Sequence, residues 1–595
     1  MSRSNAHPSA VFFLCCILCS APGASARADW PGNGALLTSS TSNFDVSIAP
    51  DAHGGVFAFW FEARPDSPGV YASRLQIDGS PAPGWPTPGR RVVETDRFAG
   101  ASTRAVPDGS GGAYVAYWNP FLSAPNPHLA VARLAADGSP APGWPTGGLL
   151  LFDEAQKPVF ARMIPDGSGG ACLAWLVWRA RSPQSFFSSV NDVRAVRVAP
   201  DGSVAAGWPA TGLAVWVPPD SAPASMLHAL EVAPDGAGGM YVAWQDSADG
   251  IGDAYVQHLT GAGEVAPGWP ADGRPVSSVA SRKSGPLLAS DGTGGVLAGW
   301  SEYRAGQYDA FLTRFTSGGA VHPGWSGSGL SLGTGVSYPY LATLAADDAE
   351  GAIVVLGSYA LDGTVSMIAR HATGSGMLDA SWPGAGVLLG TAPLGGYAWS
   401  VPDRGGGAYV MWESFPPTPP GSPRTELWAS RVTGQGNVAA GWPAGGLAVS
   451  ILEGTIHYEQ LVADGRGAAL AGWRREPLQS NAEMRGTRLT PDANPTTDVP
   501  PPPAAAGLGR AWPNPSAGEL RLELALDRAA PVEISILDLA GRRVRTLSPG
   551  WLAAGRRTVV WDGRDGRGAR VPAGIYFVQA RWPGFEGTRR VVRID

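Results

Sequence analysis

A short segment, Asp137 to Pro145, has close copies along most of the chain. Each copy ends in Trp-Pro or Trp-Ser, and successive tryptophans are 55 to 64 residues apart. Regular self-similarity at this scale predicts a repeat architecture, in which one unit is too small to bury a core alone. The tryptophans of the copies are Trp30, Trp85, Trp144, Trp208, Trp269, Trp325, Trp382 and Trp442.

Each repeat also contains a Gly-rich turn that begins with an acid. An Asp at the start of a turn accepts hydrogen bonds from the backbone that follows, and Gly supplies positive φ, so the pattern predicts a hairpin. An aromatic and β-branched run follows each turn, which is typical of a strand, and it holds a large apolar residue such as Trp175 at a fixed place. The clearest turns begin at Asp108, Asp166, Asp235 and Asp291.

A further strand in each repeat ends near a basic residue. We predict that this series is structural, with its partners on other strands. The series is Arg74, Arg133, Arg197, His258, Arg314, Arg370, Arg431 and Arg488.

These features give four strands per repeat, and one such sheet cannot bury both faces alone. Propellers stack about 4–8 four-stranded blades around an axis, so the eight copies predict an eight-bladed β-propeller over residues 29–492. Separate immunoglobulin-like domains would need about 100 residues each. We expect Trp85, Trp144, Trp208 and Trp269 to pack between neighbouring blades.

The ends of the repeat region suggest how the ring closes. The first repeat begins with Trp30, and no Trp-Pro follows the eighth repeat after Arg488. We therefore expect Trp30 to about Ser40 to pack beside the Arg488 strand. If the strand after Trp-Pro were innermost in its own blade, closure would need no such exchange.

The N-terminus has the form of an export signal. Arg3 precedes an apolar run from Val11 to Cys19, and Ala24-Ser25-Ala26 is a small-residue cleavage site. We predict a signal peptide over residues 1–28, a secreted or outer-membrane surface location, and no transmembrane segment in the mature chain. Cys172 is the one cysteine outside this region, so no internal disulfide is expected.

The C-terminal part departs from the repeats. A Pro- and Ala-rich linker at 493–507 precedes short strands over 508–595, which predict a small β-sandwich. Pro513-Asn514-Pro515, Ile536 to Val544, Trp561-Asp562-Gly563 and Gly574 to Phe577 resemble the FlgD-type Ig-like domain. That domain is similar to the type A sorting domains of type IX secretion. The resemblance implies passage across the outer membrane, contact with secretion machinery, and release or surface attachment; a passive spacer is the alternative.

The repeats themselves, as in Asp108 to Trp118, resemble a class of secreted bacterial propeller-repeat proteins over about residues 29–492. That resemblance implies fold and export and assigns no activity.

Candidate chemistry is sparse. Each Gly-rich turn has one carboxylate, which favours a turn cap over a calcium loop, and the histidines lack zinc-ligand spacing. We predict no catalytic, cofactor-binding or metal-binding residues, and the net charge of −6 argues against a nucleic-acid partner. Irregular loops place Phe186, Phe187, Trp216 and Phe415 as candidates for a ligand surface; tolerated loop drift is the alternative.

The functional hypothesis is an exported, non-catalytic propeller scaffold that binds an extracellular protein or glycan. One alternative is a glycan-active hydrolase or lyase, which would need two carboxylates together at the channel, for example Glu154 and Asp246. A structural surface-layer component is a further alternative.

Overall fold

The computed structural model describes residues 30–594 except 31–32, 41–42, 64–66, 87–88, 95–101, 119–128, 152–156, 181–188, 220–228, 247–251, 305, 334–337, 361–362, 394, 418–423, 478–480, 493–506, 513, 527–529, 553–554 and 584. All the regular elements in these residues are β-strands. Within this part of the chain, no helix has the length and apolar character needed to cross a membrane.

Between Ala35 and Leu489, the described strands form eight four-stranded antiparallel sheets. Three of them contain β2 (Asn43–Pro50), β3 (Val56–Glu62), β4 (Gly69–Leu75) and β5 (Arg90–Glu94); β6 (Ser102–Pro107), β7 (Ala113–Trp118), β8 (Leu129–Leu134) and β9 (Leu149–Leu150); β10 (Lys157–Pro165), β11 (Ala171–Ala180), β12 (Ser189–Val198) and β13 (Leu213–Trp216). Two more contain β14 (Leu230–Pro234), β15 (Met240–Asp246), β16 (Asp253–Leu259) and β17 (Arg274–Pro275); β18 (Arg282–Ser290), β19 (Val296–Arg304), β20 (Gln307–Phe315) and β21 (Leu330–Ser331). The last three contain β22 (Pro339–Ala346), β23 (Ala352–Tyr359), β24 (Thr364–Ala372) and β25 (Val387–Pro393); β26 (Ala398–Pro402), β27 (Ala408–Ser414), β28 (Glu426–Val432) and β29 (Leu447–Ser450); β30 (Thr455–Ala463), β31 (Ala469–Glu476), β32 (Ala482–Leu489) and β1 (Ala35–Ser40).

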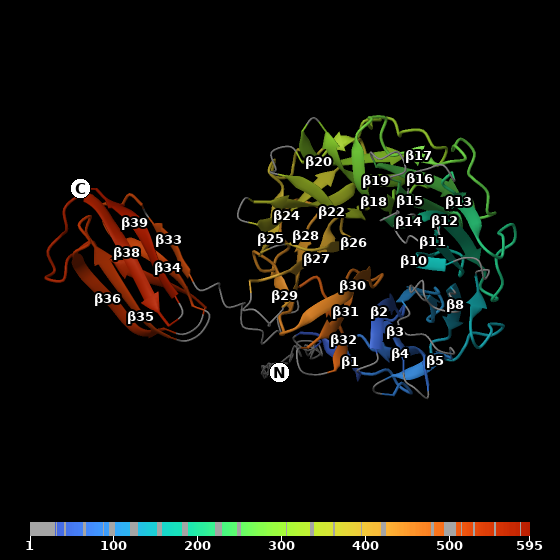
Figure 1. Cartoon of the computed structure of the whole chain (residues 1–595), viewed down its shortest axis with the longest axis horizontal. Coiled ribbons are helices and arrows are strands. Elements are labelled where there is room, and N and C mark those ends of the chain that lie inside the picture. The colour runs from blue at the N-terminus through green and yellow to red at the C-terminus, as the bar shows by residue number, and fades with distance from the viewer. Residues whose placement is uncertain are drawn as a thin grey trace, which may run out of the picture.

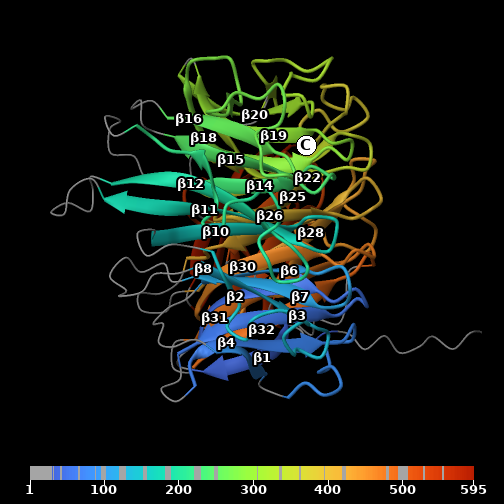
Figure 2. The same ribbon diagram turned by 90° about the vertical axis from the view of Figure 1, so that its right-hand side faces the viewer.

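The sheets are arranged around a central axis, as Figure 1 shows. The first strand of each sheet contacts the first strand of the next, and β30 contacts β2, which closes the circle. The second and third strands of the sheets meet on one face, where the β11–β12 hairpin extends beyond its neighbours (Figure 2). The predicted fold class, an all-β propeller followed by a small Ig-like sandwich, is confirmed.

The ring closes by strand exchange. β1 pairs antiparallel with β32, with Ala35 opposite Gly486 and Ser40 opposite Ala482. The first strand of the chain is thus the outer strand of the last sheet, as the missing Trp-Pro after Arg488 predicts. Throughout the ring, the strand after Trp-Pro belongs to the sheet of the preceding repeat.

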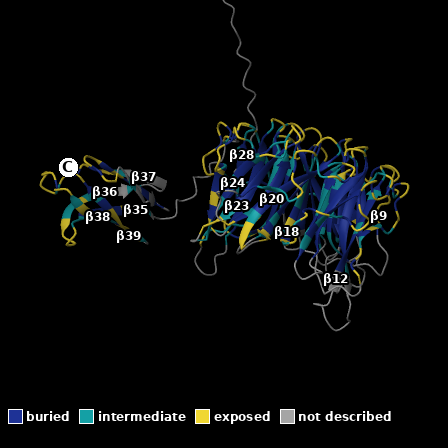
Figure 3. Ribbon diagram, turned by 90° about the horizontal axis from the view of Figure 1, so that it is seen from above, coloured by how far each residue is buried: buried dark blue, intermediate teal, exposed yellow. Residues whose placement is uncertain are grey.

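The core lies within and between the sheets, whose strands are mostly buried while the turns are exposed (Figure 3). The large residue after each Gly-rich turn is buried, including Trp175 and Trp244 at 0% exposure. The tryptophans of the Trp-Pro segments, such as Trp144, are buried between sheets. Both of these large residues in a repeat therefore exclude water from the core.

Each Gly-rich turn is capped by its own Asp. In the third repeat, one Asp166 carboxyl oxygen accepts the backbone N–H groups of Ser168 and Gly170 at 2.7 and 2.8 Å. The other oxygen accepts the Arg197 Nε–H at 2.8 Å. Asp166 therefore caps its turn as predicted, but the partner of Arg197 is this turn acid between β10 and β11 and not a residue on another strand.

The same Arg also reaches the next sheet. The carbonyl of Gly261 accepts one N–H from Arg197 at 3.2 Å and the indole N–H of Trp208 at 3.0 Å. We call this unit of acid, base, indole and neighbouring carbonyl the interblade clamp. Other carbonyls that accept both a Trp indole and the base of the preceding sheet are those of Ala136, Pro200, Ser317, Gly374 and Pro491.

The repeated segment also receives the indole of the preceding sheet. A Cβ at Gly138 would lie 2.5 Å from the Trp85 ring, so a side chain at this position would displace that indole. Gly138 also has φ of 78°, which favours glycine. The Gly of the repeated segment therefore leaves room for the Trp of the preceding sheet. The Trp of the same segment packs on the next sheet.

One member of the predicted basic series is wrong. In the sixth repeat the base that pairs with the turn acid is His371, because its Nε2 lies 2.6 Å from Asp347 Oδ2. Its Nδ1 lies 2.8 Å from Asp379 Oδ2. Arg370 is one residue earlier, so it lies on the opposite face of β24 and donates to the carbonyls of Leu332 and Gly384.

We expect His371 to make the stability of the propeller depend on pH. Burial alone would lower the pKa of His371, but the hydrogen bonds and charges of Asp347 and Asp379 raise it above 6.5. The resulting stabilisation is complete below pH 6.5 and is lost as the pH rises through the folded-state pKa. Urea unfolding at pH 5.5 to 8.5 should therefore show a falling free energy of unfolding for the wild type, and a flatter profile for His371→Arg.

Replacement of the partly exposed His322 by Gln is the control for that measurement. Identical pH profiles for the wild type and His371→Arg would contradict the prediction.

The C-terminal strands form two sheets. One contains β33 (Gly507–Trp512), β34 (Leu520–Leu526) and β37 (Gly555–Trp561), and the other contains β36 (Arg543–Leu552), β35 (Ala530–Leu537), β38 (Gly574–Trp582) and β39 (Phe585–Arg593). Leu522, Ile536 and Trp561 are fully buried in a core of their own. This arrangement is the small β-sandwich expected from the sequence.

Candidate binding site

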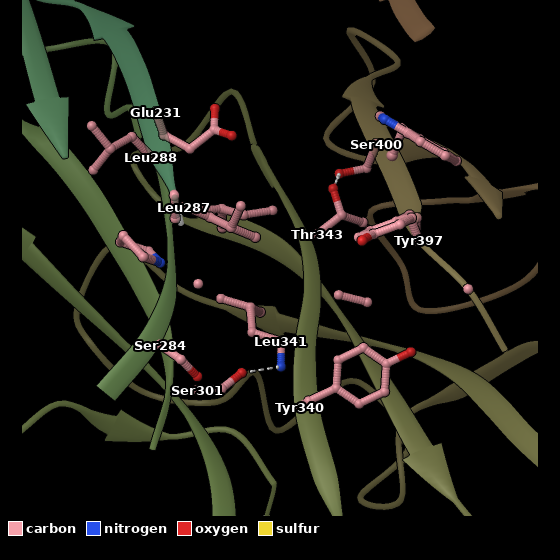
Figure 4. Close-up of a pocket in the computed structure, with 18 of the residues that line it drawn as sticks. Glu231, Ser284, Leu287, Leu288, Ser301, Tyr340, Leu341, Thr343, Tyr397 and Ser400 are labelled. Atoms are coloured by element: carbon pink, nitrogen blue, oxygen red, sulfur yellow. Dashed lines mark hydrogen bonds between the residues drawn. The ribbon is translucent and has the colours of Figure 1, made fainter. Parts of the chain in front are cut away.

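The central channel contains a cavity of about 1000 Å³. It is lined mainly by the first strands of the sheets, β6, β10, β14, β18, β22, β26 and β30. First strands are positioned by the whole ring, so side chains far apart in the sequence face one space. Figure 4 shows Glu231 of β14 and Tyr340, Thr343, Tyr397 and Ser400 from the other side of the cavity.

Tyrosines form one wall of this channel and continue onto its mouth. Tyr308 and Tyr397 are 52% and 77% exposed, although both line the cavity. Tyr308 packs on Tyr303 with ring centroids 4.8 Å apart, and Tyr340 packs on Tyr359 at 5.4 Å. Exposed aromatic rings in one place are unusual for a protein surface and typically mark a binding site.

Backbone and side-chain hydrogen bonds hold this wall in place. The Ser301 hydroxyl accepts the Leu341 N–H at 2.9 Å, and the Thr343 and Ser400 hydroxyls are 2.9 Å apart (Figure 4). These contacts join β19 to β22 and β22 to β26, so the tyrosines stand on a rigid support.

The opposite wall is polar and charged. Arg104 of β6, Arg162 of β10 and Glu231 of β14 line the cavity there. Arg162 is paired with Glu231 at 3.0 Å, and Arg104 lies 3.5 Å from the buried Asp45. The channel therefore offers apolar rings on one side and hydrogen-bonding groups on the other.

Two carboxyl groups meet beside the channel. Glu413 is 5% exposed and accepts the Tyr397 backbone N–H at 3.0 Å, and a Cβ at Gly396 would lie 2.3 Å from its carboxyl oxygen. Glu459 of β30 lies close enough to Glu413 for the two carboxyl groups to interact. Burial, followed by the charge and hydrogen bond of Glu413, raises the pKa of Glu459 to about 9.

Glu459 therefore keeps its proton at neutral pH. Its Oε1 atom is buried and has no hydrogen-bond partner in the described residues.

The sequence-predicted structural residues lie in the clamps. Trp85, Trp144, Trp208 and Trp269 are each less than 9% exposed. Asp108, Asp166, Asp235 and Asp291 cap turns and pair with the basic series.

Of the predicted ligand residues, the two that the structure describes, Trp216 and Phe415, lie in different parts of the ring. Phe186 and Phe187 lie outside the described residues. Trp216 is partly buried and stacks between sheets, with ring centroids 6.3 Å from Trp244 and 6.4 Å from Tyr255. Phe415 is close to the carboxyl pair, because a Cβ at Gly396 would lie 2.7 Å from its ring.

Only one member of the suggested acid pair falls within the described residues. Glu154 lies outside the described residues, and Asp246 is 9% exposed at the end of β15.

Sequence reasoning missed the tyrosine wall and the pair of Glu413 and Glu459. A usable signal was present for one of them. Glu413 follows the core Trp412 directly, at a place where other repeats have residues such as Phe61, Leu176 and Ser301. Only the eighth repeat also has a charged residue there, Arg474, so an acid in this position indicates a special environment.

Comparison with known proteins bears on the C-terminal sandwich. Residues 512–581 match the FlgD Ig-like domain family. The matched residues include all the segments, from Pro513 to Phe577, whose sequence resembles this domain. No curated protein matches the chain.

The chain is also similar to solved structures. A protein of unknown function from Dyadobacter fermentans is 10% identical, with 76% of this chain and 97% of that chain covered and a TM-score of 0.33. A PL25 ulvan lyase is 9% identical, with 69% and 96% covered and a TM-score of 0.37. PorZ, a surface component of the type IX secretion system of Porphyromonas gingivalis, is 10% identical, with 95% and 100% covered and a TM-score of 0.16.

Proposed function

We propose that this protein is an exported propeller that binds an extracellular glycan at the tyrosine-lined mouth of its central channel, without cleaving it. The observation that carries the proposal is the wall of exposed tyrosines beside a cavity with a polar opposite side. Sugar rings present apolar C–H faces and a rim of hydroxyl groups, so they fit one aromatic and one polar wall.

The terminal domain supports a location outside the cell. A signal peptide at 1–28 would start export, and the FlgD Ig-like domain at 512–581 would contact secretion machinery or the cell surface. Fractionation of cells that express the chain with and without residues 508–595 tests this part of the proposal. An unchanged location would contradict it.

Binding is tested with the most exposed tyrosines. Tyr308→Ala and Tyr397→Ala should each weaken glycan binding about 5- to 20-fold, because each removes one ring from the wall without opening a core. The measurement is a glycan array of neutral and acidic oligosaccharides, followed by calorimetry on the tightest ligand.

Met377→Ala is the matched control, since Met377 is 64% exposed in the turn between β24 and β25 on the opposite face. Failure of the wild type to bind any glycan, or equal binding by the tyrosine variants, would refute the proposal.

A further inference from the structure

Two arginines stand next to each other on the polar wall. Arg104 and Arg162 belong to the first strands of adjacent sheets and both line the cavity. Their side chains are 25% and 27% exposed, so their heads are accessible from the channel. Burial lowers the pKa of Arg104, Asp45 opposes this effect, and the nearby charge of Arg162 lowers it further.

Both guanidinium groups have donors to spare. Arg104 uses only Nη1, which donates to the Thr103 carbonyl at 2.6 Å and lies 3.5 Å from Asp45. In Arg162, Nε and Nη2 both donate hydrogen bonds to one carboxyl oxygen of Glu231. Among the described residues, no hydrogen bond is made by Nε or Nη2 of Arg104 or by Nη1 of Arg162.

The nearby acids do not fill these donors. Asp45 is buried, and its oxygens accept the backbone N–H groups of Val46 and Thr103 at 2.7 and 3.0 Å. Glu459 of β30 also lines the cavity, and its burial beside Glu413 raises its pKa, so that it holds its proton at neutral pH. An incoming anion would therefore meet free guanidinium donors with little repulsion from Glu459.

We propose that Arg104 and Arg162 form a subsite for an oxyanion carried by a sugar, either the carboxylate of a uronate or a sulfate ester. This inference rests on the proposed glycan binding and names the ligand class. Guanidinium groups match such oxyanions because their planar N–H forks make paired, charge-assisted hydrogen bonds. The tyrosine wall would hold the sugar rings while the arginines select the charged unit.

The test compares three probes on the full mature chain: a galacturonate hexasaccharide, its methyl ester, and a galactose hexasaccharide with sulfate esters. The wild type should bind at least one charged probe about tenfold or more tighter than the methyl ester. The charged probe that is favoured identifies the carboxylate or the sulfate as the ligand group. Arg162→Gln should remove most of this preference, and Arg104→Gln with Arg162→Gln should remove it entirely.

Arg91→Gln is the control, because Arg91 is an exposed arginine on the outer strand β5. Thermal unfolding of each variant checks that it is folded. If the double variant does not fold, Arg162→Gln alone is sufficient for the test. Equal binding of the charged probes and the methyl ester by the wild type would contradict the proposed subsite and leave glycan binding intact. An unchanged preference in Arg162→Gln would do the same. Loss of binding to every probe by the wild type would refute the proposed function as well.

Discussion

Leu37→Asp should lower the free energy of unfolding of the propeller by about 3–5 kcal/mol, because it places a charge in the core that closes the ring. Leu37 is 2% exposed and packs with Trp30, Ile48 and Met484, which come from both ends of the repeat region. The Trp30 indole N–H also donates to the Ile77 carbonyl at 3.0 Å, which joins the last sheet to the first.

The matched control is Leu36→Asp. Leu36 is adjacent in the same strand but 51% exposed, so its replacement should cost less than about 1 kcal/mol. Chemical denaturation followed by tryptophan fluorescence gives both values. Similar losses for the two variants would mean that β1 does not hold the ring closed.

The second large effect concerns Glu459. The unfolded chain loses this proton near pH 4.5, whereas the folded chain keeps it until about pH 9. Because the folded state binds more protons in this interval, the free energy of unfolding falls as the pH rises from 4.5 to about 9. The slope is at most about 1.4 kcal/mol per pH unit, and partial solvent access at the channel reduces the whole loss to about 2–4 kcal/mol.

Glu459→Gln keeps a hydrogen-bond donor for Glu413 and removes the titration. The free energy of unfolding of the variant should therefore rise relative to that of the wild type between pH 5 and 9. Above pH 9 the difference between the two free energies should stay constant. Glu453→Gln, at an exposed position nearby, is the control. Parallel pH profiles for the wild type and Glu459→Gln would contradict the raised pKa.

The ring was predictable because its determinants recur. Each Asp-capped turn and each indole such as Trp144 appears at a regular spacing, and the missing Trp-Pro after Arg488 located the closure. The basic series was less certain. Arg370 and His371 are adjacent, and only the alternation of strand faces in β24 shows that His371 pairs with Asp347.

The binding site could not be predicted in the same way. Its residues differ from one first strand to the next, so the repeat pattern contains no information about them. Glu413 and Glu459 belong to different repeats and meet only because their sheets are neighbours in the ring. Tyr308, Tyr340 and Tyr397 are likewise separated in the sequence and converge only at the channel.

The interblade clamps affect how the propeller unfolds and how it tolerates the loss of a repeat. In linear repeat proteins, the end units need specialised polar caps, and they fray first. Here Trp442 donates to Pro491 and Trp30 donates to Ile77, so the outermost repeats in the sequence are bonded on both sides like any other. The propeller therefore has no terminal repeat that can unfold at a low free-energy cost. Deletion of a single repeat would interrupt the closed ring of interblade contacts.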